Sequence, residues 1–457
     1  MRERAGNMLV VAVTAVLFVT MLVLCGMYIE LRLNGLRPSL PPLPERDKWL
    51  LTNKSYDSHS GSNTLLSPVM IGEKTGGKAY ACGFDGDAYT ALTGTLYTNL
   101  ASLLQHGSAE RLALPTKEEK QAFVTLLCSG ENFLYAAFYD ELPVDVFLPC
   151  ITGTASAGSV TDHFFVRYVF IVPDENENAY AVCLDNDENA TVLRAEGVPY
   201  HRTDPAAYTN GRGYVPFAFL REGSPAAVFT SSFTVDSVVL APGQSFFRFS
   251  LDDENTVSLL SSFGLNPNLV KSFRSRDDSS VNFVEDAGEL YIDGAVGRMT
   301  YRGTADGVPF SSLLRYGAAA DGTYTFADKV LAVRSLLNSV NRLAVGGEAY
   351  PSLVGVRSEE DGSVTFRLKY VYRGILLTAD ESDVSVTVSG NAVTGVVIRS
   401  LFCDGGYLER PVLSGLSAEL MDHGEMTDDY LAVFRSDPAT GLVSVVWVAR
   451  EKGESTP

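Results

Sequence analysis

The feature that most limits how this chain can fold is an apolar run from Met8 to Ile29, with no charged residue between Arg4 and Glu30. A helix of about 22 residues is about 33 Å long, which matches the hydrocarbon core of a bilayer. The run is too long for a cleaved secretory signal, and no small-residue cleavage site follows it. A lipoprotein would need a small residue before Cys25, where Leu24 stands. We therefore predict an uncleaved single-pass transmembrane anchor.

The orientation of the anchor follows from its position rather than from its flanking charges. Basic residues stand on both sides of the run, so the positive-inside rule gives little contrast. They are Arg2 and Arg4 before it, and Arg32, Arg37, Arg46 and Lys48 after it. Because the run begins so close to the N-terminus, we expect residues 1–7 in the cytoplasm and the bulk of the chain outside it. The predicted localisation is the cell membrane, with an extracytoplasmic main part.

Small residues within the anchor are candidates for partner binding. Ala12, Thr14, Ala15 and Gly26 would let another membrane helix approach closely. The alternative is that they face lipid and the helix only anchors the chain.

After the anchor, the chain predicts a spacer and three folded units of the α+β class. Residues 30–48 form the linker, in which four prolines between 38 and 44 favour a stiff, extended chain. We expect mixed helices and antiparallel sheets in an N-terminal domain (49–205), a β-rich middle domain (215–303) and a C-terminal helix-plus-sheet domain (304–457). The loop-like stretch 202–214 marks the first boundary.

Local patterns predict the elements of these units. Thr116 and Glu119 have the spacing of a capping box at a helix start. Apolar residues recur at helical spacing from Phe326 to Leu343, before Gly346 and Gly347. Helices are expected at 87–106, from 116 to 129, near 256–263 and at 326–343. Strands are expected at 133–139, 144–147, 164–172, 180–184, 364–370, 384–388, 393–398, 430–434 and 442–449.

The charge balance is strongly acidic, with 36 Lys and Arg against 55 Asp and Glu and a formal net charge of −19. Such a chain is repelled by nucleic-acid phosphates, so we expect no nucleic-acid partner. Anionic lipid headgroups repel it as well, which argues against attachment to a membrane surface by charge. The 46% hydrophobic content argues against intrinsic disorder.

Signatures of catalysis are missing from the sequence. There is no phosphate-binding glycine loop, no H-E-x-x-H and no G-x-S-x-G. The histidines stand singly and are interpreted as surface or packing residues: His59, His106, His163, His201 and His423. Most cysteines outside the anchor are interpreted as buried thiols, with one disulfide left open: Cys82, Cys128, Cys150, Cys183 and Cys403. We expect no catalytic site, no cofactor and no metal, and hence no enzyme.

One near-match to a calcium loop leaves an alternative open. Asp185, Asp187, Asn189, Thr191 and Glu196 stand at positions 1, 3, 5, 7 and 12 of such a loop. The loop needs glycine at its sharp turn, however, where this chain has alanine, and its flanks resemble strands. We favour an acidic turn between two strands.

Several short motifs together resemble a known family. They are Leu65-Leu-Ser-Pro-Val69, Phe263-Gly-Leu-Asn-Pro267, Arg274-Ser-Arg276, Glu289-Leu-Tyr-Ile-Asp293 and Gly297-Arg-Met-Thr-Tyr301, followed by the final helix-then-sheet unit. With the short start, single span and large exported part, they resemble the YycH/YycI family. Its members are membrane-anchored accessory regulators of the WalK–WalR (YycG–YycF) two-component system of Gram-positive bacteria.

The resemblance implies a function in signal transduction. It implies contacts with a sensor histidine kinase and a sister accessory membrane protein, which tune kinase output for cell-wall homeostasis. The alternative from another class is an envelope structural or peptide-binding module without kinase contact. A third and weaker alternative is a cell-wall hydrolase.

The predicted topology can be tested by thiol labelling on intact cells. A cysteine introduced at an exposed position of the exported part should react with a membrane-impermeant reagent, because that part faces the outside. Labelling that requires permeabilised cells would show that the orientation is wrong.

Overall fold

The computed structural model describes residues 65–449, except for segments at 83–85, 156–157, 204–213, 221, 230–232, 235–238, 243–250, 252, 295–296, 305–306, 315–322, 341–349, 373, 377–382, 400, 405–411, 414–429 and 437–442. The chain divides into two units, Met1–His59 and Ser60–Pro457, and every described residue belongs to the second. No helix within the described ranges is long and apolar enough to cross a membrane. The predicted anchor lies outside them.

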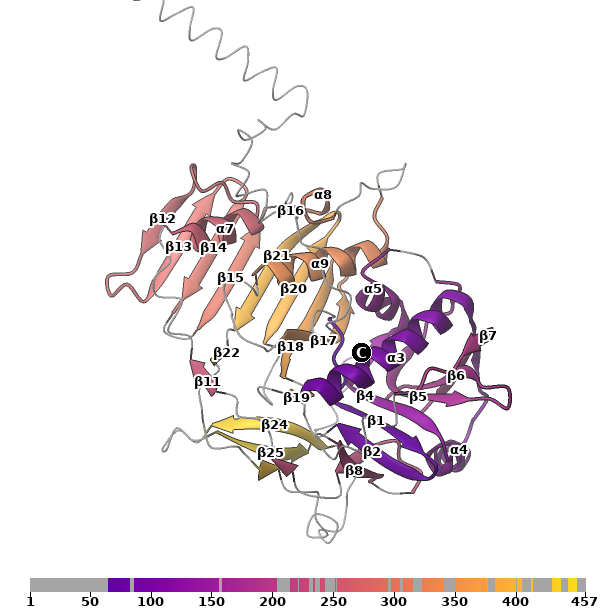
Figure 1. The fold of residues 1–457 in the computed structure, drawn as a ribbon. Helices are drawn as coiled ribbons and strands as arrows, with labels where there is room; N and C mark the ends of the chain where they lie inside the picture. The colour runs from indigo at the N-terminus through magenta and orange to yellow at the C-terminus, as the bar shows by residue number, and fades with distance from the viewer. Residues whose placement is uncertain are drawn as a thin grey trace, which may run out of the picture. The chain divides into compact units, whose positions relative to one another are not determined.

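The first sheet is antiparallel and has nine strands (Figure 1). Their order is β3 (Ser108–Arg111), β7 (Ala190–Pro199), β6 (Asn178–Leu184), β5 (Phe165–Pro173), β4 (Phe133–Pro143), β1 (Met70–Thr75), β2 (Lys78–Cys82), β8 (Tyr214–Phe219) and β9 (Ala227–Phe229). Helix α3 (Gly86–His106) contacts β1, β6 and β7. The helix begins and ends as its sequence predicts, and its leucines are buried in the core.

Helix α4 (Lys117–Ser129) confirms the capping box. The Thr116 hydroxyl accepts a hydrogen bond from the Glu119 N–H at 3.1 Å, and the Glu119 carboxylate accepts one from the Thr116 N–H at 3.0 Å. Both bonds satisfy donors that the first helical turn leaves without a partner.

The strand predicted at 144–147 is wrong. Residues Val144–Val146 form a 3₁₀ turn, and α5 (Phe147–Thr152) follows it directly. Pro143 ends β4 because its ring fixes φ, here at −61°, and supplies no N–H to a strand partner. The apolar residues are buried as predicted, but in a helical turn rather than in a ladder.

The second sheet has twelve strands and draws on both the predicted middle and C-terminal units. Its main order is β12 (Lys271–Arg274), β13 (Ser280–Glu285), β14 (Gly288–Asp293), β15 (Arg298–Gly303), β21 (Ala392–Arg399), β20 (Val384–Ser389), β18 (Val364–Tyr372), β19 (Ile375–Leu376), β24 (Tyr430–Ser436) and β25 (Val443–Ala449). In addition, β16 (Val308–Pro309) pairs with β21 and β17 (Tyr350–Ser358) with β18. Among the described pairs only β19 with β24 is parallel. The domain boundaries stay predictions.

Short elements complete the described structure. Strand β10 (Phe233–Thr234) pairs with β23 (Val412–Leu413), and β11 (Val239–Pro242) pairs with β22 (Leu401–Asp404). The helix α8 (Phe310–Leu313) follows β16.

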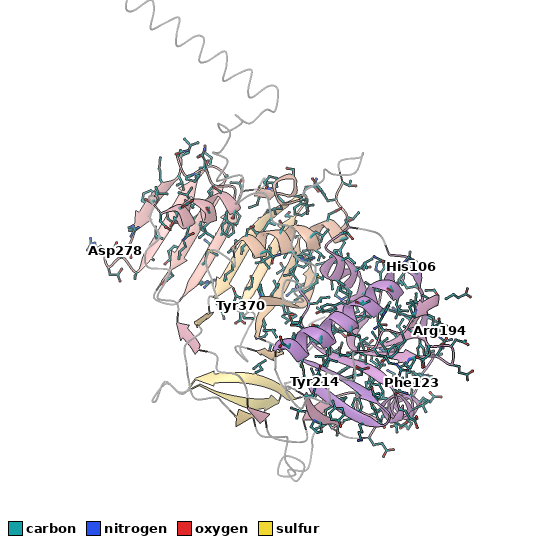
Figure 2. All side chains as sticks on the ribbon, viewed as in Figure 1. His106, Phe123, Arg194, Tyr214, Asp278 and Tyr370 are labelled. Carbon is teal, nitrogen blue, oxygen red and sulfur yellow. The ribbon has the colours of Figure 1, made fainter. Side chains whose placement is uncertain are left out.

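Two helices cover one face of the second sheet (Figures 1 and 2). They are α7 (Glu254–Ser262) and α9 (Phe326–Val340), which confirm the predicted helices in these regions. Phe263, just after α7, stacks on Tyr301 of β15 with ring centroids 4.8 Å apart. Phe326 of α9 stacks on Phe366 of β18 at 6.0 Å. The α+β class with mixed helices and antiparallel sheets is therefore confirmed.

Tyr301 occupies a close-fitting place in this layer. A Cβ atom at Gly303 would lie 2.8 Å from the Tyr301 hydroxyl oxygen, and one at Gly288 would lie 3.1 Å from the ring. Burial, with a smaller contribution from Glu285, raises the pKa of Tyr301 to about 12, so the hydroxyl is protonated. The hydroxyl is buried and has no hydrogen-bond partner among the described atoms.

Tyr301→Phe should raise the free energy of unfolding by about 1 kcal/mol, because it removes a buried hydroxyl that has left water without gaining a hydrogen bond. The matched control is Tyr135→Phe. The Tyr135 hydroxyl donates to the Pro225 carbonyl at 2.8 Å, so this variant should lower the same quantity by about 1 kcal/mol. Denaturant unfolding followed by circular dichroism measures both, and shifts of the same sign would contradict the assignment.

Candidate functional site

The segment Leu65–Val69, which we call the joint, connects the first sheet to the second. Its Leu65 carbonyl accepts a hydrogen bond from the Leu353 N–H of β17 at 2.7 Å. Its Ser67 N–H donates to the Ser352 hydroxyl of β17 at 2.9 Å. The joint thus lies along one end of β17, although Ser67 and Ser352 are 285 residues apart in sequence.

The joint is also bonded to helix α3. The Tyr97 hydroxyl donates to the Leu66 carbonyl, and the Tyr89 hydroxyl donates to the Pro68 carbonyl at 2.9 Å. Burial raises the pKa of Tyr89 well above its usual value, and nearby Tyr97 raises it further, so Tyr89 is a permanent donor. Side chains of α3, together with one side chain and one backbone N–H of β17, therefore hold the same five-residue segment.

Apolar burial reinforces these hydrogen bonds. Leu65 and Leu66 are buried, with 3% and 1% of their surfaces exposed. Next to them Val69 and Tyr139 of β4 pack on Val371 of β18 and Leu376 of β19. Burying a leucine contributes about 1.5–3 kcal/mol, so the joint belongs to the core rather than to a mobile linker.

A buried lysine completes the contact between β4 and β18. The Lys369 ammonium lies 5.4 Å from the centre of the Tyr139 ring, and Lys369 is 2% exposed. An ammonium over an aromatic face gains electrostatic energy that is larger away from water. The Tyr139 ring therefore offsets part of the cost of burying this charge.

A second contact links α5 to α9. The Arg334 guanidinium of α9 donates to the Pro149 carbonyl at 3.4 Å. Gly153 ends α5 with φ at 69°, and a Cβ atom there would lie 2.8 Å from Arg334 Nη1. Glycine is needed at this position both for the left-handed backbone and for the close approach.

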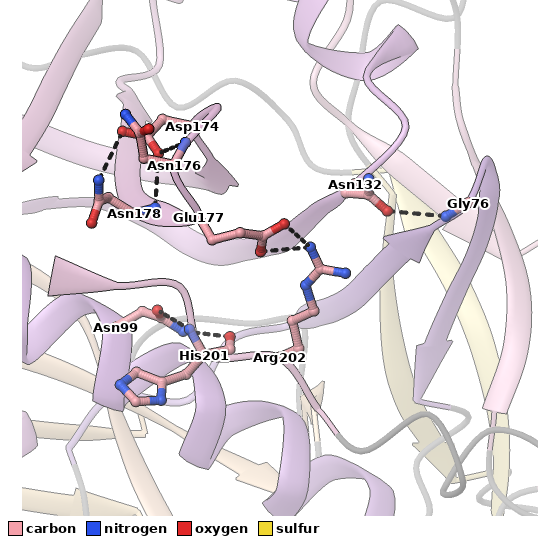
Figure 3. Close-up of polar contacts among 9 residues, drawn as sticks. All are labelled: Gly76, Asn99, Asn132, Asp174, Asn176, Glu177, Asn178, His201 and Arg202. Atoms are coloured by element: carbon pink, nitrogen blue, oxygen red, sulfur yellow. Dashed lines mark hydrogen bonds and ion pairs between the residues drawn. The ribbon is translucent and has the colours of Figure 1, made fainter. Parts of the chain in front are cut away.

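Side-chain hydrogen bonds and an ion pair hold the chain just after β7 against the first sheet and helix α3 (Figure 3). The buried Asn99 amide of α3 accepts from the His201 N–H at 3.0 Å and donates to the His201 carbonyl at 2.9 Å. Beside it, one Arg202 nitrogen contacts both Glu177 oxygens, at 2.9 and 3.1 Å. His201 therefore acts through its backbone.

The calcium-loop candidate forms the turn between β6 and β7. The Asp185 carboxylate accepts from the N–H groups of Asp187 and Asn189, both at 2.9 Å. The Lys120 ammonium donates to the Asn189 side-chain oxygen at 2.7 Å, so a cation of the protein already occupies this position. Glu196 lies far along extended β7 and cannot close the loop. The favoured acidic turn is what the structure contains.

The same turn occurs twice. In the β5–β6 turn the Asp174 carboxylate accepts from the N–H groups of Asn176 and Asn178, at 2.7 and 2.8 Å (Figure 3). The backbone bond to Asn178 is the main reason that the pKa of Asp174 is lowered. Local hydrogen bonding therefore accounts for both acidic turns.

The other predicted residues are not gathered into a site. His163 bonds to Asp145 at 2.8 Å on the surface, and His106 ends α3.

Four cysteines are free thiols within the described residues: Cys82, Cys128, Cys150 and Cys183. Burial raises the pKa of Cys150 and Cys183 to about 12, which leaves them unreactive at neutral pH. Ala12, Thr14, Ala15 and Gly26 lie outside the described residues, and their role stays a prediction. No group of metal ligands occurs in the described ranges.

The sequence indicates the joint only through its Leu-Ser-Pro motif. In the structure it is an irregular segment before β1, held by Tyr89, Tyr97 and Ser352, none of which is among the predicted site residues. The spacing of the two tyrosines is a usable indication, because it places both on one side of α3 two turns apart.

Comparison with known proteins identifies the arrangement. The crystal structure of YycH from Bacillus subtilis matches 86% of this chain and 95% of its own, with a TM-score of 0.53 and 12% sequence identity. The chain has the YycH fold. No family model matches the sequence, and no curated protein matches it. The resemblance to YycH is thus confirmed as a likeness of fold.

Within the YycH fold, the joint can be tested through its serine. Ser352→Ala should lower the free energy of unfolding by about 1–3 kcal/mol, because the Ser67 N–H loses its partner in a part-buried position. It should also speed hydrogen exchange of the Ser67 amide. Ser272→Ala, on exposed β12, is the control and should change stability by less than about 0.5 kcal/mol. Equal effects of the two substitutions would contradict the role of Ser352.

Proposed function

We propose that this protein is a membrane-anchored extracytoplasmic accessory regulator of a sensor histidine kinase that controls cell-wall homeostasis, and that it is not an enzyme. The observation that carries the proposal is the YycH fold over 86% of the chain. The proposed partners are the kinase and a sister accessory membrane protein. Contact is made through the anchor and the exported domains.

Regulation of this kind requires that the protein bind one kinase conformation more tightly than another. A tenfold preference corresponds to about 1.4 kcal/mol, which a few well-packed side chains can supply. The joint supports the proposal physically. It is the first described segment that follows the predicted anchor in the sequence, and its hydrogen bonds to α3 and β17 would pass a pull on the chain to both sheets.

A second candidate is an envelope module that binds peptides without kinase contact. The observation that favours it is β12, at the end of the second sheet, which pairs only with β13 among the described strands. Its Phe273 is 58% exposed. An extended peptide can add to such an edge through main-chain hydrogen bonds.

Cross-linking in cells tests the first proposal. A photo-cross-linker at Ala15 should capture the sensor kinase, because the small residues are proposed to face its membrane helix. The control is Leu17, which lies on the opposite side of the predicted helix and should capture little. Deletion of the gene should change transcription of the genes that the kinase controls.

Two results would overturn the regulator proposal when they occur together. The first is the absence of any kinase adduct at Ala15, and the second is an unchanged transcript profile after deletion. Wall-degrading activity of the purified protein in a zymogram would support the hydrolase alternative instead.

A further inference from the structure

The second sheet has one face that α7 and α9 do not cover. Side chains alternate between the two faces of a strand, and directly paired residues share a face. The residues paired across β13, β14, β15 and β21 therefore separate into a buried set, such as Leu290, Tyr301 and Val396, and an open set. Six basic residues belong to the open set, and we call them the basic face: Lys271, Arg298, Arg302, Arg357, Arg367 and Arg399.

All six basic side chains are exposed, whereas the acidic residues in the same set are not. Glu289 and Asp293 are half-buried, and Asp383 is buried. The Glu289 carboxylate accepts from the Asn282 amide at 2.9 Å, and the Asp383 carboxylate accepts from the Tyr370 N–H at 2.9 Å. At the margin Arg357 pairs with Glu359 at 3.3 Å. The outward charge of the described face is therefore positive.

The sign of this charge is the unexpected property. An open face of an antiparallel sheet is normally polar, so polarity alone needs no explanation. This chain, however, has 55 acidic residues against 36 basic ones. Six exposed charges of the minority sign on one face form a local exception to the acidic surface.

The placement of individual arginines agrees with a site rather than with packing. Arg298 of β15 and Arg399 of β21 stand directly opposite each other, a like-charge pairing that disfavours the sheet itself. Asp293 stands on the other side of Arg298 and offsets part of that repulsion. The Arg367 guanidinium lies against Gly355, where a Cβ atom would come within 2.8 Å of its nitrogen. Glycine there leaves room for the arginine to lie flat on the sheet.

Aromatic and apolar side chains lie among these charges. Phe273, Tyr291 and Val397 belong to the same open set, and Phe273 is 58% exposed. Arginine mixed with aromatic residues is the composition enriched in protein interfaces. Eight strands of about six residues give a face of about 700 Å², close to the roughly 800 Å² that one partner contributes to a stable protein interface.

We propose that the basic face is the docking surface for an acidic surface of a partner protein. The charge complements such a partner, the area suffices for it, and the exposed aromatic residues can be buried by it. A nucleic acid or an anionic membrane is disfavoured by the formal net charge of −19 of the whole chain. The proposal deepens the proposed function and rests on it for the class of partner, a protein.

A photo-cross-linker at Thr300, between Arg298 and Arg302 on β15, tests the proposal in cells that express the full chain. Mass spectrometry of the adduct should give a protein segment rich in Asp and Glu. The double substitution Arg298→Gln/Arg399→Gln should lower the adduct yield at least fivefold, with an unchanged circular dichroism spectrum. Binding of the captured protein to the purified full chain should weaken by the same factor and also weaken with added salt.

The matched control is Lys78→Gln/Arg194→Gln, which removes two exposed charges from the first sheet (Arg194, Figure 2) and should leave the yield unchanged. The proposal fails if Thr300 gives no protein adduct, a lipid adduct only, or a segment without excess acid. It also fails if both double variants lower the yield equally.

Transcript profiles of the same strains separate this proposal from the proposed function. An acidic partner captured at Thr300 while deletion leaves the kinase-controlled genes unchanged would uphold the docking surface and reject the regulator. A changed profile without an acidic adduct would reject the docking surface alone.

Discussion

The described structure depends on the hydrogen bonds and burial that hold Leu65–Pro68 between helix α3 and strand β17. Backbone groups that leave water must find partners, and here two tyrosine hydroxyls, one serine hydroxyl and one backbone N–H supply them. The partners belong to helix α3, which contacts the first sheet, and to strand β17 of the second sheet, so the bonds of one short segment also join the two sheets. The buried residues of both then form one continuous core.

Alternate residues of each strand in the second sheet point to opposite faces, so one face can form the core while the other is available for binding. One set of alternate residues is apolar and lies under α7 and α9, where Phe263 and Phe326 stack on ring partners. The other set contacts the joint and β4 at Ser352 and Lys369, and elsewhere it is not covered by these helices and carries the basic face. The same strands can therefore hold the fold and present a partner surface without compromise between the two.

Sequence patterns predicted the elements that are determined by interactions between residues close together in the sequence. The start of α4, the helix α3 and the acidic turn between β6 and β7 follow from neighbouring residues, and the structure confirms them. The strand expected at 144–147 failed because Pro143 outweighs β-branched side chains. Neither the joint nor the basic face could be predicted, since Ser67 meets Ser352 and Arg298 meets Arg399 only through the strand order. Nothing near these residues in the sequence indicates their partners.

The position of β21 between β15 and β20 determines how late in synthesis the second sheet can be completed. Strand β15 ends at Gly303, but β21, with which it pairs, begins only at Ala392. The Leu65 carbonyl likewise has no hydrogen-bond donor until Leu353 of β17 has been synthesised. Pairings so distant in sequence form slowly, because long loops must close first. A chain that is synthesised from its N-terminus therefore has strands without their neighbours until nearly all of it has been made. Unpaired strand edges can pair with other chains, so the late strands β20 and β21 are the ones that end this exposure.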